Sequence, residues 1–173
     1  MKNPILRFGL IGGIVLFILA QLQWQFVGTS MSYNQAQIVG YLSIIFALTS
    51  IYFAVRKYRE EVGAGYISFG KAFQIGSLTA LIPAAFMFVS TVIFYLSYGE
   101  EFKAWALAEM QKTTPPEKLA MMMEQYETNQ ALYDNPYFQG LIMFLTVMVI
   151  GLIVSAITAF ILQKKRPIEL AKT

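Results

Sequence analysis

The sequence predicts an all-α membrane protein: a bundle of four transmembrane helices with an extracytoplasmic helical hairpin between spans three and four. Of the 173 residues, 57% are hydrophobic and only 13% are charged. The apolar residues gather in four runs, at about residues 5–27, 38–55, 73–95 and 138–162. Each run approaches the about 20 residues with which a helix crosses a bilayer. Lipid offers the backbone no hydrogen-bond partners, so such runs form helices, and we expect residues 1–173 to be a single integral-membrane domain.

The placement of charge predicts which side each segment faces. The N-terminus, the connection near residues 56–71 and the C-terminal tail together hold ten basic and three acidic residues. The connections at residues 28–37 and 97–137 hold three basic and seven acidic residues. The two sides therefore carry net charges of +7 and −4. Because excess Lys and Arg mark cytoplasmic loops, we expect both termini in the cytoplasm.

The first run also imitates a secretory signal peptide, because Lys2 and Arg7 precede an apolar stretch. No small-x-small cleavage site follows, and the polar residues Gln21 and Gln23 lie where cleavage would be expected. We therefore expect this run to be retained as the first span. Trp24 then fits an anchor at the membrane–water interface.

The second run ends in a basic cluster that extends to the start of the third: Arg56, Lys57, Arg59 and Lys71. Each basic side chain near an anionic leaflet contributes about 1 kcal/mol of attraction, so these four are candidate contacts for lipid headgroups or for a partner. Anchoring of the topology is the simpler interpretation. Nucleic acid is not an expected partner, because the basic residues lie beside spans.

Small residues recur at helical spacing within every span. They are Gly9 and Gly13; Ser43, Ala47, Ser50 and Ala54; Gly76, Ala80 and Ala84; and Gly151, Ser155 and Ala159. Such seams let helices approach closely in lipid. Packing within one chain is the simpler interpretation, and a homo-oligomer interface or a substrate groove is the alternative. Pro83 is expected to kink the third span.

The connection at about residues 99–135 is long enough to have its own structure. A short helix is expected over residues 100–112, and Thr114-Pro115-Pro116-Glu117 predicts a capping box that starts a second helix. A candidate outer interaction face comprises Trp105, Leu119, Met122, Met123 and Tyr126. Methionine-rich surfaces adapt to varied partners. The alternatives are the buried face of a helical hairpin and a helix lying on the bilayer surface.

The composition excludes several kinds of chemistry. The chain contains no Cys and no His, which removes thiolate nucleophiles, histidine-ligated haem, most zinc sites and Ser-His-Asp triads. No acidic residue lies in a span, where it would be a functional candidate. We therefore expect no enzyme activity, and we assign no catalytic, metal-binding or cofactor-binding residue.

Several segments together resemble a known family. They are Arg7–Gly13, Arg56–Glu61, Ile67–Phe73, Asn135-Pro136 and Gly151–Ala156. The pattern resembles the domain-of-unknown-function family 4199, which comprises small bacterial membrane proteins with four spans. The resemblance implies the four-span topology and the bacterial inner membrane. No catalytic or binding residue follows from it, because the family is uncharacterised.

Two functional classes fit these observations. The first is a non-catalytic component of the bacterial inner membrane that assembles with a membrane-protein partner or with itself. The second is a small transporter, channel or protein that binds lipid or a small molecule. A polar, water-filled cavity would favour the second class, and an exposed apolar face on the hairpin would favour the first.

Overall fold

A computed structural model describes residues 3–26 and 31–164. The helices are α1 (Pro4–Phe26), α2 (Tyr33–Leu48), α3 (Ser50–Glu61), α4 (Phe69–Thr113), α5 (Pro116–Thr128), α6 (Gln130–Tyr133) and α7 (Pro136–Leu162). Within the described residues, four stretches are long and apolar enough to cross a membrane: α1, α2 together with α3, α4 and α7. The prediction of an all-α protein with four spans is confirmed.

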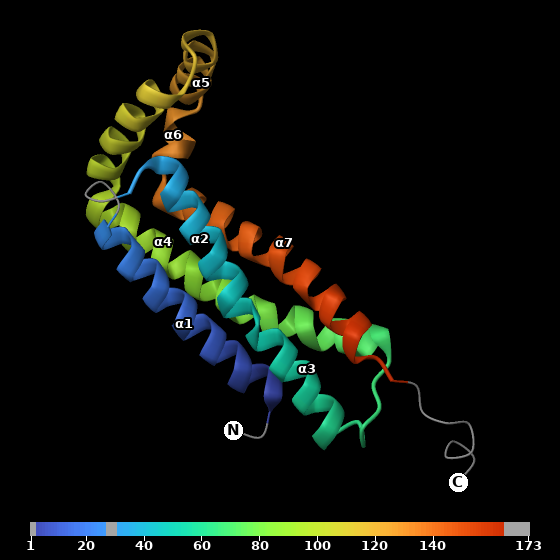
Figure 1. Cartoon of the computed structure of the whole chain (residues 1–173). Helices are drawn as coiled ribbons and strands as arrows, with labels where there is room; N and C mark the ends of the chain where they lie inside the picture. The colour runs from blue at the N-terminus through green and yellow to red at the C-terminus, as the bar shows by residue number, and fades with distance from the viewer. Residues whose placement is uncertain (1–2, 27–30, 165–173) are drawn as a thin grey trace.

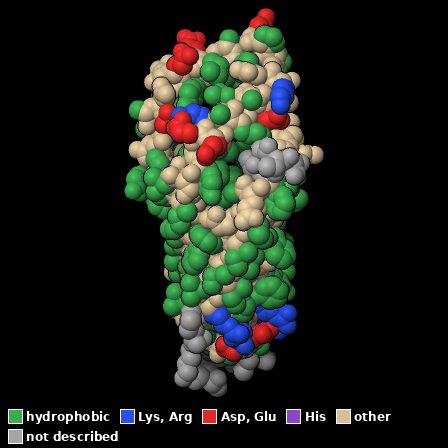
Figure 2. Space-filling view, turned by 90° about the vertical axis from the view of Figure 1, so that its left-hand side faces the viewer, with side chains coloured by type: hydrophobic (Ala, Val, Ile, Leu, Met, Phe, Trp, Pro, Cys, Tyr) green, Lys and Arg blue, Asp and Glu red, His purple; other side chains and the backbone are tan. Residues whose placement is uncertain are grey.

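The four spans run side by side, alternating in direction (Figure 1). The start of α1, the end of α3, the start of α4 and the end of α7 lie together at one end of the molecule, which we call the basic end. At the opposite end, the last part of α4 continues beyond the other spans and returns through α5 and α6. Figure 2 shows a band without charged side chains between the two ends.

The second span is longer than predicted and is interrupted. It begins at Tyr33, where Ser32 accepts a hydrogen bond from the Gln35 N–H and the Gln35 side chain binds the Ser32 N–H. This capping box was not predicted, since the helix was expected from residue 38. The span breaks at Thr49, whose hydroxyl donates to the Phe46 carbonyl at 2.7 Å. Such back-bonding competes with the helical pattern and bends helices.

The third span and the first helix of the connection are one helix, not two as predicted. The 45 residues of α4 extend about 65 Å at a rise of 1.5 Å per residue, roughly twice the hydrocarbon thickness of a bilayer. The expected break near residues 96–99 is absent because a fall in hydropathy does not end a helix. After Gly99, the sequence contains strong helix formers such as Ala104, Leu107 and Met110.

The capping box expected at Thr114 is also wrong. Thr114 ends α4, with its N–H bonded to the Met110 carbonyl, and Pro115 occupies the cap position of α5 without a side-chain hydrogen bond. Pro116 is the first residue of α5, where its fixed φ suits a helix start. Pro115 and Pro116 therefore form the turn and start α5 without a side-chain cap.

The spans share one apolar core, and the small-residue seams of the third and fourth spans face each other where α4 meets α7. A Cβ atom added to Gly151 would lie 2.7 Å from the Cβ of Ala80, and one added to Gly76 would lie 2.7 Å from the Ser155 hydroxyl oxygen. Ala80 and Ser155 are themselves fully buried. Packing within the chain, the simpler interpretation of these two seams, is therefore the one observed.

Arg59 holds the basic end together. Its Nη1 atom donates to the carbonyl of Leu162, the last residue of α7, at 3.3 Å. Nearby, Ile67 and Lys164 exchange two backbone hydrogen bonds of 3.1 and 2.8 Å. The end of the fourth span is thus bound both by α3 and by the segment that precedes α4.

We expect the substitution Arg59→Gln to lower the free energy of unfolding by about 1.5–3 kcal/mol, the contribution typical of a hydrogen bond to a charged group. Titration with SDS, followed by circular dichroism, would measure it. Arg56→Gln is the matched control, because the pair of Arg56 with Glu60 lies at the surface and should contribute little. Equal stability of both variants would contradict this role of Arg59.

Candidate functional site: the groove of the helical hairpin

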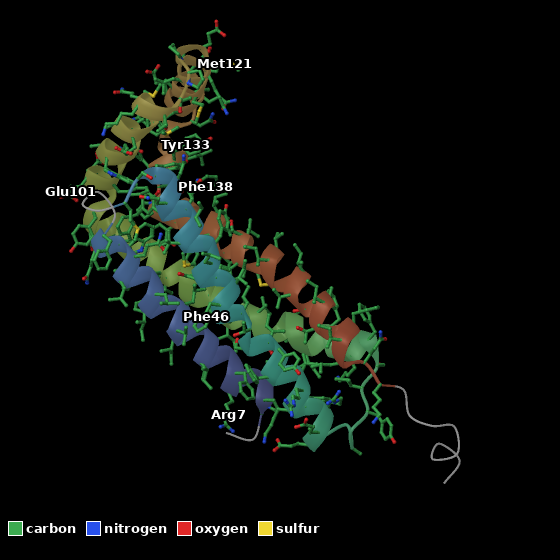
Figure 3. All side chains as sticks on the ribbon, in the orientation of Figure 1. Arg7, Phe46, Glu101, Met121, Tyr133 and Phe138 are labelled. Carbon is green, nitrogen blue, oxygen red and sulfur yellow. The ribbon has the colours of Figure 1, made fainter. Side chains whose placement is uncertain are left out.

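The hairpin, by which we mean α4 from Leu96 onward together with α5 and α6, forms the end of the molecule opposite the basic end. Figure 3 shows Met121 near its tip, with Tyr133 and Phe138 where the chain returns to the spans. No residue of α5 is buried. The two sides of the hairpin therefore do not form a closed core of their own.

A groove of about 530 Å³ lies between the two sides of the hairpin. Its apolar lining includes Phe102, Leu107 and Met110 from α4, and Met122 and Met123 from α5. Its charged lining consists of Glu100, Glu101, Lys103 and Asp134. The groove therefore combines an apolar floor with three carboxylates and one ammonium group.

Asp134 joins the helices of the hairpin at the base of the groove. Its Oδ1 atom accepts hydrogen bonds from the Tyr126 hydroxyl at 2.7 Å and from the Lys103 Nζ atom at 3.0 Å. Its Oδ2 atom accepts from the Gln130 amide at 3.3 Å. These donors come from α5, α4 and α6, so one carboxylate connects three helices. Lys103 also contacts Glu100 at 3.1 Å.

The pKa values of this network reflect its pairing. Burial alone would raise the pKa of Asp134, but hydrogen bonds from Tyr126 and Lys103 outweigh it and lower that pKa below its ordinary value. The hydrogen bond to Asp134 raises the pKa of Lys103. At neutral pH the pair is thus ionised, and both charges stabilise the closed junction.

A stack of aromatic rings fixes the hairpin on the spans. Trp24 of α1 stacks on Phe94 of α4 with ring centroids 3.8 Å apart. Phe102 packs edge-on against Trp24 at 5.8 Å and lies 5.6 Å from Trp105. Tyr33, at the start of α2, lies 6.1 Å from Trp105. Because these rings join α1 and α2 to the extended part of α4, the base of the hairpin has a fixed orientation.

The structure divides the predicted outer interaction face. Met122, Met123 and Tyr126 line the hairpin groove together. Leu119 is half-buried on α5 but does not line the groove. Trp105 belongs to the aromatic stack on another side of α4. The continuity of α4 determines this position, because Phe94, Phe102 and Trp105 then share one helical face.

The predicted basic cluster lies at the basic end. Arg56 pairs with Glu60 at 2.9 Å and Lys57 with Glu61 at 2.7 Å, each one helical turn away. The Lys71 ammonium donates to the side chain of Gln74. Arg56, Lys57 and Lys71 are at the surface, whereas Arg59 turns inward to α7. Contacts of this cluster with lipid headgroups stay a prediction.

Sequence reasoning missed the pair formed by Lys103 and Asp134. The two residues are far apart in the sequence, and their contact depends on how α5 and α6 return along α4. In the sequence, Asp134 precedes Asn135-Pro136, a combination that is typical of a helix-breaking turn. Nothing in the local sequence distinguishes it from the other acidic residues of the connection.

A family model described as a protein of unknown function (DUF4199) matches residues 7–164. Neither the curated proteins nor the solved structures include a significant match to the chain.

Proposed function

The chain belongs to the domain-of-unknown-function family 4199, and from this premise we propose that it is a non-catalytic membrane protein whose hairpin groove docks a partner. We place it in the bacterial inner membrane, with the termini in the cytoplasm and the hairpin outside. The excess of basic residues at the end opposite the hairpin supports this orientation.

The observation that carries the proposal is the groove itself. The side chains of Met122 and Met123 face an open space of about 530 Å³ instead of a packed core. A volume of this size accommodates several apolar side chains. Methionine side chains adjust their shape to an incoming apolar surface, and such grooves bind amphipathic helices.

The acidic residues of the groove favour a partner of opposite charge. Glu100, Glu101 and Asp134 line the groove, and the one ammonium group there, that of Lys103, already contacts Glu100 and Asp134. The whole connection carries a net charge of −4. A second copy of the hairpin would bring like charges together, so we propose a partner segment that is basic and amphipathic.

Purified protein in lipid nanodiscs should bind a designed basic amphipathic peptide. An acidic peptide with the same apolar face should bind at least about tenfold more weakly. Binding of the basic peptide should weaken as salt screens the charges. Calorimetric titration of each peptide would measure both effects.

The matched variants use three adjacent methionines. Met122→Gln combined with Met123→Gln should weaken binding of the basic peptide at least about tenfold, which corresponds to about 1.4 kcal/mol. Met121→Gln should leave binding unchanged, because Met121 is 64% exposed and does not line the groove. Equal binding of both peptides, or equal losses in the two variants, would contradict the proposal.

A further inference from the structure

We propose that a second cavity, within the spans, binds an uncharged amphiphile: a molecule with one apolar chain and a neutral headgroup that forms hydrogen bonds. This interhelical pocket has a volume of about 370 Å³ and lies among α1, α2, α4 and α7 near the hairpin end. It adjoins the hairpin groove at Tyr33 and Phe102, which line both cavities, but the proposal does not depend on the partner proposed above.

The lining of the pocket changes from apolar to polar along the spans. Toward the middle of the spans, the walls are mostly apolar, with Leu16, Ala20, Ile44, Met87 and Met143. The hydroxyls of Ser43 and Thr146 also line this part, but each donates to a carbonyl of its own helix. Toward the hairpin end, the walls include Gln23, Trp24, Tyr33 and Gln37. An amphiphile would therefore place its chain toward the middle of the spans and its headgroup at the polar end.

The charge of the lining restricts the headgroup. None of the described residues that line the pocket is Lys, Arg, Asp or Glu. A charged headgroup would lose hydration there without gaining a counter-charge, which is costly. A headgroup with hydroxyl or carbonyl groups finds amide and hydroxyl partners instead. The Gln23 amide is held in place, since its Nε2 atom donates to the Ala36 carbonyl at 2.6 Å.

Small residues keep the pocket open, and exposed residues border it. A Cβ atom added to Gly40 would lie 3.5 Å from the Gln23 Nε2 atom, which is an ordinary contact distance. A larger side chain at Gly40 would thus enter the pocket without displacing the backbone. Tyr41 on α2 and Ile142 on α7 line the pocket and are 49% and 43% exposed. The pocket is therefore accessible from the surrounding lipid between α2 and α7.

The tryptophans provide a direct signal. The chain contains two, Trp24 and Trp105, and both line the pocket. Protein in nanodiscs of unlabelled phospholipid should be titrated with a monoacylglycerol whose chain carries bromine, which quenches tryptophan fluorescence on close approach. The comparison ligand is the fatty acid with the same brominated chain, ionised at alkaline pH. Ligand that merely dissolves in the bilayer gives quenching that does not saturate.

We expect saturable quenching by the neutral ligand, with an apparent affinity at least about tenfold higher than that of the anionic ligand. Gly40→Phe should abolish the saturable part, because its ring fills the pocket. Leu42→Phe, on the same helix but 60% exposed and outside the pocket, should retain it. Thr146→Phe fills the pocket from α7 and serves if the Gly40 variant does not fold.

Two results would overturn the proposal. One is quenching that never saturates or that is equal for the neutral and anionic ligands. The other is saturable quenching that persists in folded Gly40→Phe or Thr146→Phe protein, since the ligand would then lie elsewhere. Circular dichroism establishes that each variant is folded.

Discussion

Replacing Gly151 by leucine is expected to lower the free energy of unfolding by about 1–3 kcal/mol, the usual cost of overpacking. Even one added carbon would lie 2.7 Å from the Cβ atom of Ala80, so the α4 and α7 backbones must separate. These two helices form the most extensive helix pair in the structure. Titration with SDS, followed by circular dichroism, measures the change.

Two compensating substitutions, Gly151→Ala and Ala80→Gly, test directly whether α4 and α7 meet at this point. Gly151→Ala should destabilise the protein, and Ala80→Gly should restore part of the loss because it removes the atom that the new methyl group would meet. Gly99→Ala is the control, because a Cβ atom there would lie 3.6 Å from its nearest neighbour and alanine favours helix over glycine. Additive effects of the Ala80 and Gly151 changes would show that the helices do not meet at this point.

The second large effect is expected at the junction of the hairpin. Asp134→Asn should increase the hydrogen-exchange rates of the α5 amides at least about tenfold, because the charged bonds to Lys103 and Tyr126 are lost. With no buried residue of its own, α5 has little else to hold it closed. Exchange in the spans should stay unchanged.

Acid should have the same effect as that substitution. Because the pKa of Asp134 is lowered in the folded protein, its contribution is complete above the ordinary pKa of 3.8 and is lost as the pH falls below it. The pKa of Lys103 is raised in the folded protein, so the stabilisation by its ammonium group is complete below the ordinary pKa of 10.5 and is lost as the pH rises above it. Hairpin exchange, corrected for its intrinsic pH dependence, should therefore be slowest between these values.

The surface pair of Lys112 and Glu109 is the control for both experiments. The two side chains lie 2.7 Å apart, but that of Lys112 is 69% exposed, so Lys112→Gln should barely alter exchange. If Asp134→Asn and Lys112→Gln have equal effects, Asp134 does not close the hairpin.

The four spans were predictable because few backbone conformations satisfy all their own hydrogen bonds in lipid. An apolar run of about 20 residues becomes helical in lipid, and all four runs are helical, the second with a break at Thr49. Their ends were less predictable. Hydropathy falls after Tyr95, yet α4 continues to Thr113, because helix formation depends on propensity and tertiary contacts such as the ring of Phe102 against Trp24.

The candidate site could be predicted only in part. The spacing of Met122, Met123 and Tyr126 indicated one face of a helix, and these residues do share the groove. The prediction grouped Trp105 with them, on a separate helix expected over residues 100–112. Within the continuous α4, Trp105 instead follows the face of Phe94 and Phe102.

The pairing of Lys103 with Asp134 lay beyond sequence reasoning for a different reason. It requires the register of two antiparallel segments, which the turn at Pro115 and the break at Asn129 determine jointly. The role of Arg59 was likewise hidden, because its bond to the Leu162 carbonyl depends on where the fourth span ends. From the sequence, Lys103 and Asp134 were only charges of the connection, and Arg59 was predicted only as a contact for lipid headgroups or a partner.

Docking of a partner at the outer surface requires the hairpin groove to lie outside the cytoplasm and the basic end inside. The chain has no native cysteine, so single cysteines can be placed at Glu117 on α5 and at Val62 after α3. A membrane-impermeant maleimide applied to intact spheroplasts should label Glu117→Cys at once and Val62→Cys only after the membrane is permeabilised. Labelling of Val62→Cys in intact spheroplasts, with Glu117→Cys protected until permeabilisation, would contradict the proposed orientation and the docking function that rests on it.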